Sequence, residues 1–131
     1  MSAHAATVAQ AMRPRLSSCT LRTPVMEVAR RMQDEGVRAI IVASAGSDLI
    51  AGVVTDLDLL RAVMEGRTEG MASDIMTMEL PPNVFARDRL GEALARMRER
   101  DAELVVVMDG SPSRPVGVLS YADVATYLAR R

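Results

Sequence analysis

The sequence is poor in the side chains on which most catalytic and metal sites depend. Its 131 residues include one histidine, His4, and one cysteine, Cys19. A single cysteine excludes an internal disulfide and a cysteine-rich zinc site, and we expect it to be a buried thiol. Asp56 and Asp58 are two positions apart at a predicted helix start, so their side chains point in different directions. We therefore expect no catalytic residue, no metal site and no enzymatic activity.

The chain also lacks lysine, tryptophan and any long apolar run. All 16 basic residues are arginine, and with 17 acidic residues they give a formal net charge of −1. This balance, with only 2% aromatic residues, offers neither the basic surface nor the stacking side chains of a nucleic-acid-binding protein. No apolar run approaches the ~20 residues of a membrane-spanning helix, and the first residues lack the hydrophobic core of a signal peptide. We expect a cytoplasmic protein that binds neither nucleic acid nor membrane.

What the sequence does contain is an internal repeat. The motif Gly52-Val53-Val54-Thr55-x-x-Asp58 recurs 65 positions later as Gly117-Val118-Leu119-Ser120-x-x-Asp123. Self-similarity at a fixed spacing indicates a duplicated structural unit. We predict two repeats, residues 8–66 and residues 71–131, joined by the linker Gly66–Gly70.

The hydrophobic pattern predicts a β-α-β-β-α order in each repeat, and hence an α/β (α+β) fold. A short lead-in segment begins each repeat, because Val8–Met12 matches Ala72–Met76 at an offset of 64. The strand runs are apolar throughout, which is typical of sheets covered by helices. Because one unit of about 60 residues buries little area alone, we expect the repeats to pack together with pseudo-twofold symmetry. The predicted strands are 18–21, 39–43, 50–54 and 83–86, and the closing helices are 56–65 and 121–129.

The first helix of the first repeat is predicted from Val25, Val28, Ala29 and Met32, which follow the i, i+3, i+4, i+7 spacing of one buried face. Thr23 is expected to cap this helix, with Pro24 as its first residue. In the second repeat, residues 109–115 are expected to form the turn between the last two strands.

The Thr/Ser-x-x-Asp motif at each strand-to-helix junction has two compatible interpretations. As a capping box, the hydroxyl accepts a hydrogen bond from the amide of the aspartate, whose carboxylate reaches back to the first amide. A cap of this kind contributes about 1 kcal/mol. As part of a ligand site, the helix N-terminus attracts a phosphate, and a carboxylate near its start can accept both hydroxyls of a ribose.

Together these motifs resemble a tandem cystathionine-β-synthase (CBS) domain pair, also called a Bateman module. The resemblance rests on both copies of the Gly-x-x-Thr/Ser-x-x-Asp motif in register, supported by Ser73–Thr77 and Glu35–Ile40, and it covers the chain from about Val8 to Leu128.

The resemblance implies a regulatory module that binds AMP, ADP, ATP or another adenosyl compound in clefts between the repeats and signals to a partner protein. No cofactor is expected to be required. The same resemblance implies a homodimer and an unidentified effector protein. The nucleotide-binding residues that it implies are Thr55, Asp58, Val37, Arg38, Ala39, Thr23, Ser120, Asp123, Ala102 and Leu104.

The two expected sites differ in charge. Arg38 of the first repeat aligns with Glu103 of the second, and Thr23 aligns with Asp88. A carboxylate close to a phosphate would repel it, by about 1 kcal/mol or more. We therefore expect the first site to take a phosphorylated ligand, and the second to take a nucleoside-like ligand or none.

The alternative to a ligand sensor is a structural or dimerisation module with no bound nucleotide. The closing helices of both repeats carry apolar residues that either form dimer contacts or complete the internal core. These residues are Leu59, Leu60, Val63, Met64, Val124 and Leu128.

Overall fold

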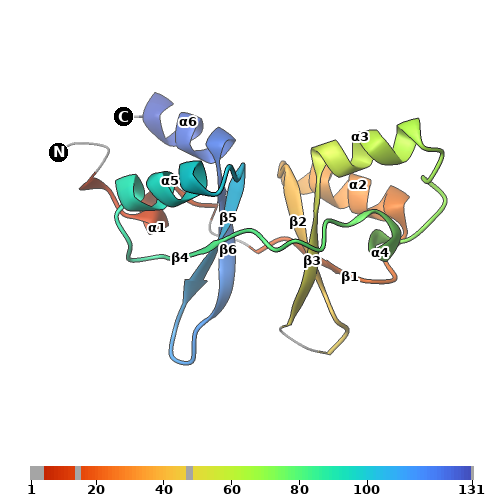
Figure 1. The fold of residues 1–131 in the computed structure, drawn as a ribbon, viewed down its shortest axis with the longest axis horizontal. Coiled ribbons are helices and arrows are strands. Elements are labelled where there is room, and N and C mark those ends of the chain that lie inside the picture. Colours follow the sequence, from red (N-terminus) through yellow and green to blue (C-terminus); the bar gives the residue numbers. More distant parts are fainter. Residues whose placement is uncertain (1–4, 14–15, 47–48, 131) are drawn as a thin grey trace. The chain divides into compact units, whose positions relative to one another are not determined.

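The chain folds into two compact units with the same order of strands and main helices (Figure 1). The computed structural model describes residues 5–13, 16–46 and 49–130. One unit consists of residues 17–80 and is called the Asp58 unit. The other consists of residues 81–131 together with residues 1–16 and is called the Asp123 unit. Each unit is built around one three-stranded sheet.

The Asp58 unit has the predicted β-α-β-β-α order, followed by a short additional helix. Its sheet has the order β1-β2-β3, with β1 parallel to β2 and β2 antiparallel to β3. The elements are β1 (Ser18–Thr20), α2 (Val25–Glu35), β2 (Ala39–Ala43), β3 (Ile50–Thr55), α3 (Asp56–Met64) and α4 (Ala72–Ile75).

The Asp123 unit repeats this arrangement with the order β4-β5-β6. Its hairpin loop is shorter than predicted, because Asp109, Arg114 and Pro115 belong to the paired strands rather than to the turn. Pro115 is tolerated there because β6 is an edge strand. The elements are α1 (Val8–Ala11), β4 (Asn83–Phe85), α5 (Leu90–Glu99), β5 (Leu104–Asp109), β6 (Arg114–Ser120) and α6 (Tyr121–Ala129).

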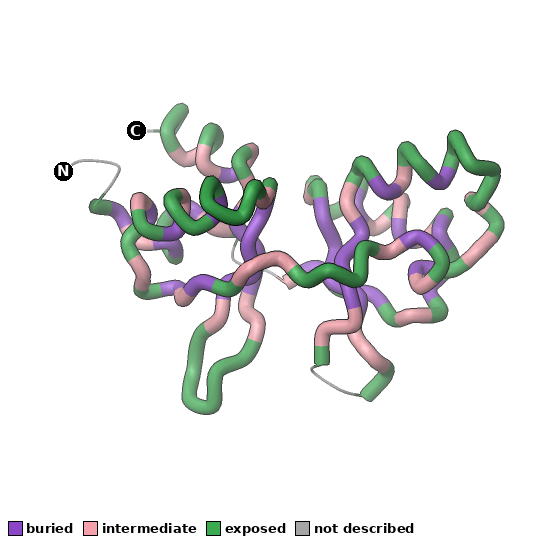
Figure 2. Tube along the Cα trace, in the orientation of Figure 1, coloured by how far each residue is buried: buried purple, intermediate pink, exposed green. Residues whose placement is uncertain are grey.

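Each unit has its own hydrophobic core, and the buried stretches follow the strands and the inner faces of the helices (Figure 2). In the Asp58 unit Val28 and Met32 of α2 pack with Ile40, Val42 and Val54 of the sheet. The i, i+4 spacing on α2 and the alternation along β2 place these side chains on facing surfaces. The predicted helix face and strand runs are therefore confirmed.

The short lead-in segments pack on the repeat to which they do not belong in sequence. Helix α4, which begins the second repeat, packs in the core of the Asp58 unit. Helix α1, which begins the first repeat, packs in the core of the Asp123 unit. Equivalent backbone hydrogen bonds hold the two lead-in helices in place. The amide of Ala72 donates to the carbonyl of Thr23 (2.8 Å), and the amide of Val8 donates to the carbonyl of Asp88 (2.8 Å). The compact units are thus not the same stretches of chain as the sequence repeats.

Helix α2 does not begin as its sequence indicates. Thr23 was expected to cap it, with Pro24 as its first residue; instead Pro24 is the capping residue and makes no side-chain cap. The hydroxyl of Thr23 accepts a hydrogen bond from the amide of Thr20 (3.0 Å) and closes the preceding turn. The Asp88 carboxylate does the same for the amide of Phe85 (2.8 Å). These two residues are turn-forming residues, because a short polar side chain competes for nearby backbone groups.

Helices α2 and α5 end in the same way with different residues. The amide of Val37 donates to the carbonyl of Met32 (3.0 Å), and that of Ala102 donates to Met97 (2.8 Å). Both closures need a left-handed residue, which is Gly36 (φ 64°) in one case and Asp101 (φ 51°) in the other. Only Asp101 has a side chain that opposes this conformation.

Replacing Asp101 with glycine should therefore stabilise the protein, by about 0.5–1 kcal/mol. Chemical denaturation monitored by circular dichroism measures the change. The reciprocal variant, Gly36→Asp, should lose a similar amount, and Asp101→Asn is the control that keeps a side chain of the same size. A destabilised Asp101→Gly variant would show that the carboxylate contributes more than its backbone strain costs.

Cys19 lies on β1 and is buried, as predicted. Burial raises the pKa of its thiol; the nearby Arg31 guanidinium and a hydrogen bond with Thr23 act in the opposite direction and are weaker. Among the described residues, no helix has the length and apolar character needed to cross a membrane.

Candidate ligand-binding site

The carboxylate of Asp58 is buried at the N-terminus of α3, with 4% of the residue exposed. Its Oδ2 atom accepts hydrogen bonds from the backbone amide (2.9 Å) and the hydroxyl (3.1 Å) of Thr55. The amide of Asp58 in turn lies 3.2 Å from the Thr55 hydroxyl oxygen, which completes a capping box. The capping interpretation of the motif is confirmed here.

Asp123 occupies the equivalent position on α6 and is 7% exposed. Its Oδ2 accepts from the amide (2.9 Å) and the hydroxyl (3.0 Å) of Ser120. In both units the capping box uses Oδ2, so the Oδ1 atom is left to interact with other groups.

In each unit a side chain from a lead-in segment donates a hydrogen bond to Oδ1. In the Asp58 unit the hydroxyl of Thr77 donates to Asp58 Oδ1 (3.1 Å). In the Asp123 unit Nε of Arg13 donates to Asp123 Oδ1 (3.1 Å). Arg13 and Thr77 are equivalent at the offset of 64 residues. Each carboxylate therefore links the start of a closing helix to a lead-in segment.

Glycine in the repeated motif permits this approach. A Cβ atom on Gly52 would lie 2.7 Å from the carbonyl oxygen of Thr77, and one on Gly117 would lie 2.6 Å from that of Arg13. The amide of Val53 donates to the Thr77 carbonyl (3.0 Å), and the amide of Thr77 donates back to Val53 (2.8 Å). The two glycines thus make room for the backbone of the lead-in segments.

Several predicted site residues meet at the same end of each sheet. Ala39 pairs with Thr55 across β2 and β3, and the carbonyl of Arg38 accepts from the amide of Asp56 (3.0 Å). Leu104 pairs with Ser120 in the same way across β5 and β6. Val37 and Ala102 precede these strands as the last residues of the helix closures described above. The sequence-predicted set, apart from Thr23, is therefore divided into two equivalent groups.

Thr23 is not part of the group in its own unit. It follows β1, which runs parallel to β2 with Thr20 beside Ala43, whereas Thr55 lies beside Ala39. Thr23 and Asp58 are therefore at opposite ends of β2. Asp88 is placed in the same way, because Phe85 lies beside Met108, far from the Ser120 end of β5.

A polar cavity of about 200 Å³ adjoins Asp58 between α3 and the lead-in segment. Arg61 lies in its wall with Nη1 3.5 Å from Asp58 Oδ1, and Arg67 donates from Nη2 to the carbonyl of Asp74 (2.6 Å). Ligand pockets usually measure 300–1,000 Å³. The enclosed part of this cavity is therefore the size of a sugar or phosphate group.

Sequence reasoning missed Arg13, Thr77, Arg61 and Arg67. The repeat alignment contained a signal for the first two, since they directly follow Met12 and Met76 at the end of the matched lead-in. Arg61 could have been found from its i, i+3 spacing with Asp58 on one helix face.

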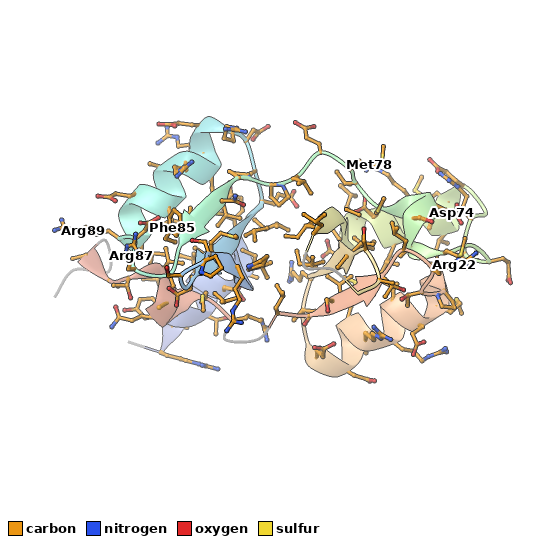
Figure 3. The ribbon with its side chains drawn as sticks, turned by 90° about the horizontal axis from the view of Figure 1, so that it is seen from below. Arg22, Asp74, Met78, Phe85, Arg87 and Arg89 are labelled. Carbon is orange, nitrogen blue, oxygen red and sulfur yellow. The ribbon has the colours of Figure 1, made fainter. Side chains whose placement is uncertain are left out.

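The turns that follow β1 and β4 carry exposed arginines away from these carboxylates. Arg87 lies over the ring of Phe85, with its guanidinium carbon 5.3 Å from the ring centroid (Figure 3). Arg22 and Arg89 are exposed on the equivalent turns. A cation–π contact at the surface contributes about 0.5–1 kcal/mol, so this pair holds the turn in place.

The model of one protein family, described as CBS domain, matches residues 8–65 and 72–130. The chain belongs to the CBS domain family. Both matches include a complete Gly-x-x-Thr/Ser-x-x-Asp motif, so the protein contains two CBS domains in tandem. The resemblance to a tandem CBS domain pair, inferred from the repeated motif, is confirmed.

Solved CBS structures share the fold over nearly the whole chain. An uncharacterised conserved protein from Pyrococcus horikoshii is 23% identical with a TM-score of 0.82, and the match covers 100% of this chain and 96% of the Pyrococcus chain. A CBS domain protein from Pyrobaculum aerophilum, complexed with AMP, is 24% identical with a TM-score of 0.77, and the match covers 96% of this chain and 100% of the Pyrobaculum chain. The CBS domain pair of protein MJ0100, in complex with 5′-methylthioadenosine and S-adenosyl-L-methionine, is 15% identical with a TM-score of 0.80. This match covers 95% of this chain and 97% of the MJ0100 chain. No curated protein matches the sequence.

Proposed function

We propose that this CBS domain pair is a regulatory module that binds an adenosyl compound and signals its presence to a partner protein. The observation that carries the proposal is the pair of buried carboxylates, Asp58 and Asp123, each with Oδ2 in a capping box and Oδ1 outside it. A carboxylate oxygen held in this way can accept hydrogen bonds from ribose hydroxyls without loss of the helix cap.

The ligands named for solved CBS structures support an adenosyl class. AMP, 5′-methylthioadenosine and S-adenosyl-L-methionine have the adenosine group in common and differ in charge at the 5′ position. A site that accepts the shared ribose diol through a carboxylate suits all three. We therefore propose AMP, ADP or ATP, or another adenosyl compound, as the ligand, with no additional cofactor and no catalytic step.

The proposed binding residues fall into the two groups described above. Asp58 and Asp123 accept the ribose hydroxyls, and Thr55 and Ser120 lie beside the ribose or phosphate. Backbone and side chains at Val37, Arg38 and Ala39 in one unit, and at Ala102 and Leu104 in the other, line the adenine positions. Thr23 is retained as a proposed contact, although within its own unit it is distant from Asp58.

A nucleotide panel tests the proposal directly. Thermal unfolding should be followed with AMP, ADP, ATP, NADH and S-adenosylmethionine. A ligand present at about 100 times its dissociation constant adds about 2.7 kcal/mol to the stability, which raises the midpoint of a chain of this length by roughly 10 °C. If none of the five compounds raises the midpoint, the structural module without nucleotide becomes the better account.

We also propose a cytoplasmic homodimer that uses the exposed face of α3. Leu60, Val63 and Met64 are 54%, 67% and 76% exposed, and Leu57 extends the same face. Leu59, by contrast, packs against the core of the Asp58 unit, as Val124 does in the Asp123 unit. Of the two uses that the sequence left open, Leu59 and Val124 serve the internal core, and we propose the dimer contact for the exposed residues of α3. A contiguous apolar face of this kind is typical of a protein–protein contact.

Replacing Leu60 with arginine should dissociate the dimer, because the buried centre of an interface does not accept an unpaired charge. Size-exclusion chromatography with light scattering should show the monomer mass at concentrations where the wild type is dimeric. Leu80→Arg, a change of another exposed leucine outside α3, is the control and should remain dimeric. A dimeric Leu60→Arg variant would exclude this face as the contact.

A further inference from the structure

Arg13 is an arginine beside Asp123 at the position that Thr77 occupies beside Asp58. Its Nε donates to Asp123 Oδ1 at 3.1 Å, with 44% of the arginine side chain and 8% of the aspartate side chain exposed. Among the described residues, the terminal amino groups of Arg13 have no hydrogen-bond partner. The guanidinium is thus held through Nε, and its side chain remains partly accessible to solvent.

One backbone hydrogen bond is equivalent in the two units, whereas the residue type at positions 13 and 77 differs. The amide of Arg13 donates to the carbonyl of Val118 (3.4 Å), as the amide of Thr77 donates to Val53 (2.8 Å). This places the side chain at position 13 or 77 over the carboxylate of its unit. In the Asp58 unit that side chain is a neutral hydroxyl, which can turn aside at little cost. In the Asp123 unit it carries a full positive charge.

The cation that balances Asp58 comes from a different element. Arg61 lies one turn further along α3, with Nη1 3.5 Å from Asp58 Oδ1. The equivalent residue on α6 is Thr126, whose hydroxyl donates to the carbonyl of Ala122 (3.0 Å). Arg13 therefore supplies at Asp123 the charge that Arg61 supplies at Asp58. Both arginines lie at Oδ1, but Arg13 makes the shorter contact and comes from a lead-in segment.

We propose that Arg13 makes the Asp123 site selective for ligands that combine a ribose diol with an anionic group such as phosphate. This inference rests on the proposed adenosyl-binding function. A diol that bonds to Asp123 Oδ1 competes with Arg13 for that oxygen and draws the guanidinium away from its counter-charge. A phosphate on the same ligand restores that counter-charge, because the guanidinium fork matches phosphate oxygens in a bidentate geometry. A neutral nucleoside loses the ion pair without replacement, and a sulfonium ligand adds a like charge.

The inference is not opposed by the aligned carboxylates that were expected to keep phosphate from the Asp123 site. Asp88, which was expected to repel phosphate, lies at the other end of its sheet with its carboxylate bonded to Phe85. Glu103 is at the Asp123 end, where its carbonyl accepts from the amide of Tyr121 (3.3 Å). Its side chain is exposed, so solvent and salt screen its repulsion.

The test isolates the Asp123 site with Asp58→Asn and measures AMP and adenosine affinities by calorimetry. With Arg13 present, AMP should bind at least tenfold more tightly than adenosine. In the Arg13→Met background that ratio should fall to within threefold, with adenosine binding unchanged or improved, and Arg13→Lys should restore part of it. Thr77→Met is the matched control and should leave the ratio unchanged. Thermal unfolding of every variant confirms that it is folded.

Each contrary outcome has a distinct meaning. An unchanged ratio in Arg13→Met would overturn the inference and leave the adenosyl function intact. If the wild type binds AMP but the Asp58→Asn variant does not, Asp123 is not a ligand site and the inference also fails. If the wild type binds neither AMP nor adenosine, the proposed function fails with it.

Discussion

Replacing Asp58 and Asp123 together with asparagine should abolish the binding of AMP and leave the protein folded. Asparagine keeps one side-chain oxygen for the capping box, but its amide group cannot accept a hydroxyl proton. A hydrogen bond to a charged group contributes about 1.5–3 kcal/mol, and 1.4 kcal/mol is tenfold in affinity. Loss of two ribose hydrogen bonds should therefore weaken each site by about 100-fold or more, as measured by titration calorimetry.

Asp56→Asn is the matched control for the Asp58 substitution. Asp56 belongs to the same first turn of α3 but is exposed, so its replacement removes the same charge from the helix N-terminus without touching the buried carboxylate. Its AMP affinity should stay within threefold of the wild type. Near-normal AMP binding by the double variant would show that neither carboxylate holds the ligand.

Replacing Gly52 with alanine should destabilise the Asp58 unit by about 2–3 kcal/mol. The added methyl group would lie 2.7 Å from the Thr77 carbonyl oxygen and 2.9 Å from the sulfur of Met76. The first of these atoms belongs to the backbone, so the lead-in segment must move and the bridge between Val53 and Thr77 weakens. Overpacking of this kind typically costs 1–3 kcal/mol. Chemical denaturation measures the loss, and hydrogen exchange should show faster opening of residues 72–77.

Gly66→Ala separates crowding from backbone strain. Gly66 has a φ of 69° and nothing within 4 Å of its added methyl group, so its replacement should cost only about 1 kcal/mol. Hydrogen exchange at residues 72–77 should be unchanged in this variant. If Gly52→Ala is no more harmful than Gly66→Ala, the close approach does not constrain the motif.

The local features of each unit could be predicted from the sequence because they depend on neighbouring residues. The Thr55-x-x-Asp58 motif specifies a capping box through residues three positions apart, and that box is present. Strand β2 was predicted with its observed bounds, since apolar and β-branched residues fill it between a helix end and a turn. Helix α6 was likewise predicted from Tyr121 to Ala129.

The partners that the lead-in segments bring to the carboxylates could not be predicted in this way. Arg13 and Asp123 are separated by 110 positions, and no periodicity connects them. The repeat alignment placed each lead-in with the sequence that follows it, whereas packing places it in the other unit. The prediction that Thr23 caps α2 is wrong for a related reason. A threonine hydroxyl can accept a hydrogen bond from an amide that precedes it or from one that follows it, and the folded turn determines which.

The exchange of lead-in helices means that neither CBS motif can be excised at its own sequence boundaries without losing part of its covering. A fragment of residues 8–66 would carry α1, which packs in the core of the Asp123 unit. It would lack α4, whose Ala72 and Ile75 are buried in the core that contains α2 and α3. If the two repeats arose by gene duplication, each repeat depends on the other for the lead-in helix that covers its core. Such mutual dependence favours inheritance of the two copies as an inseparable pair.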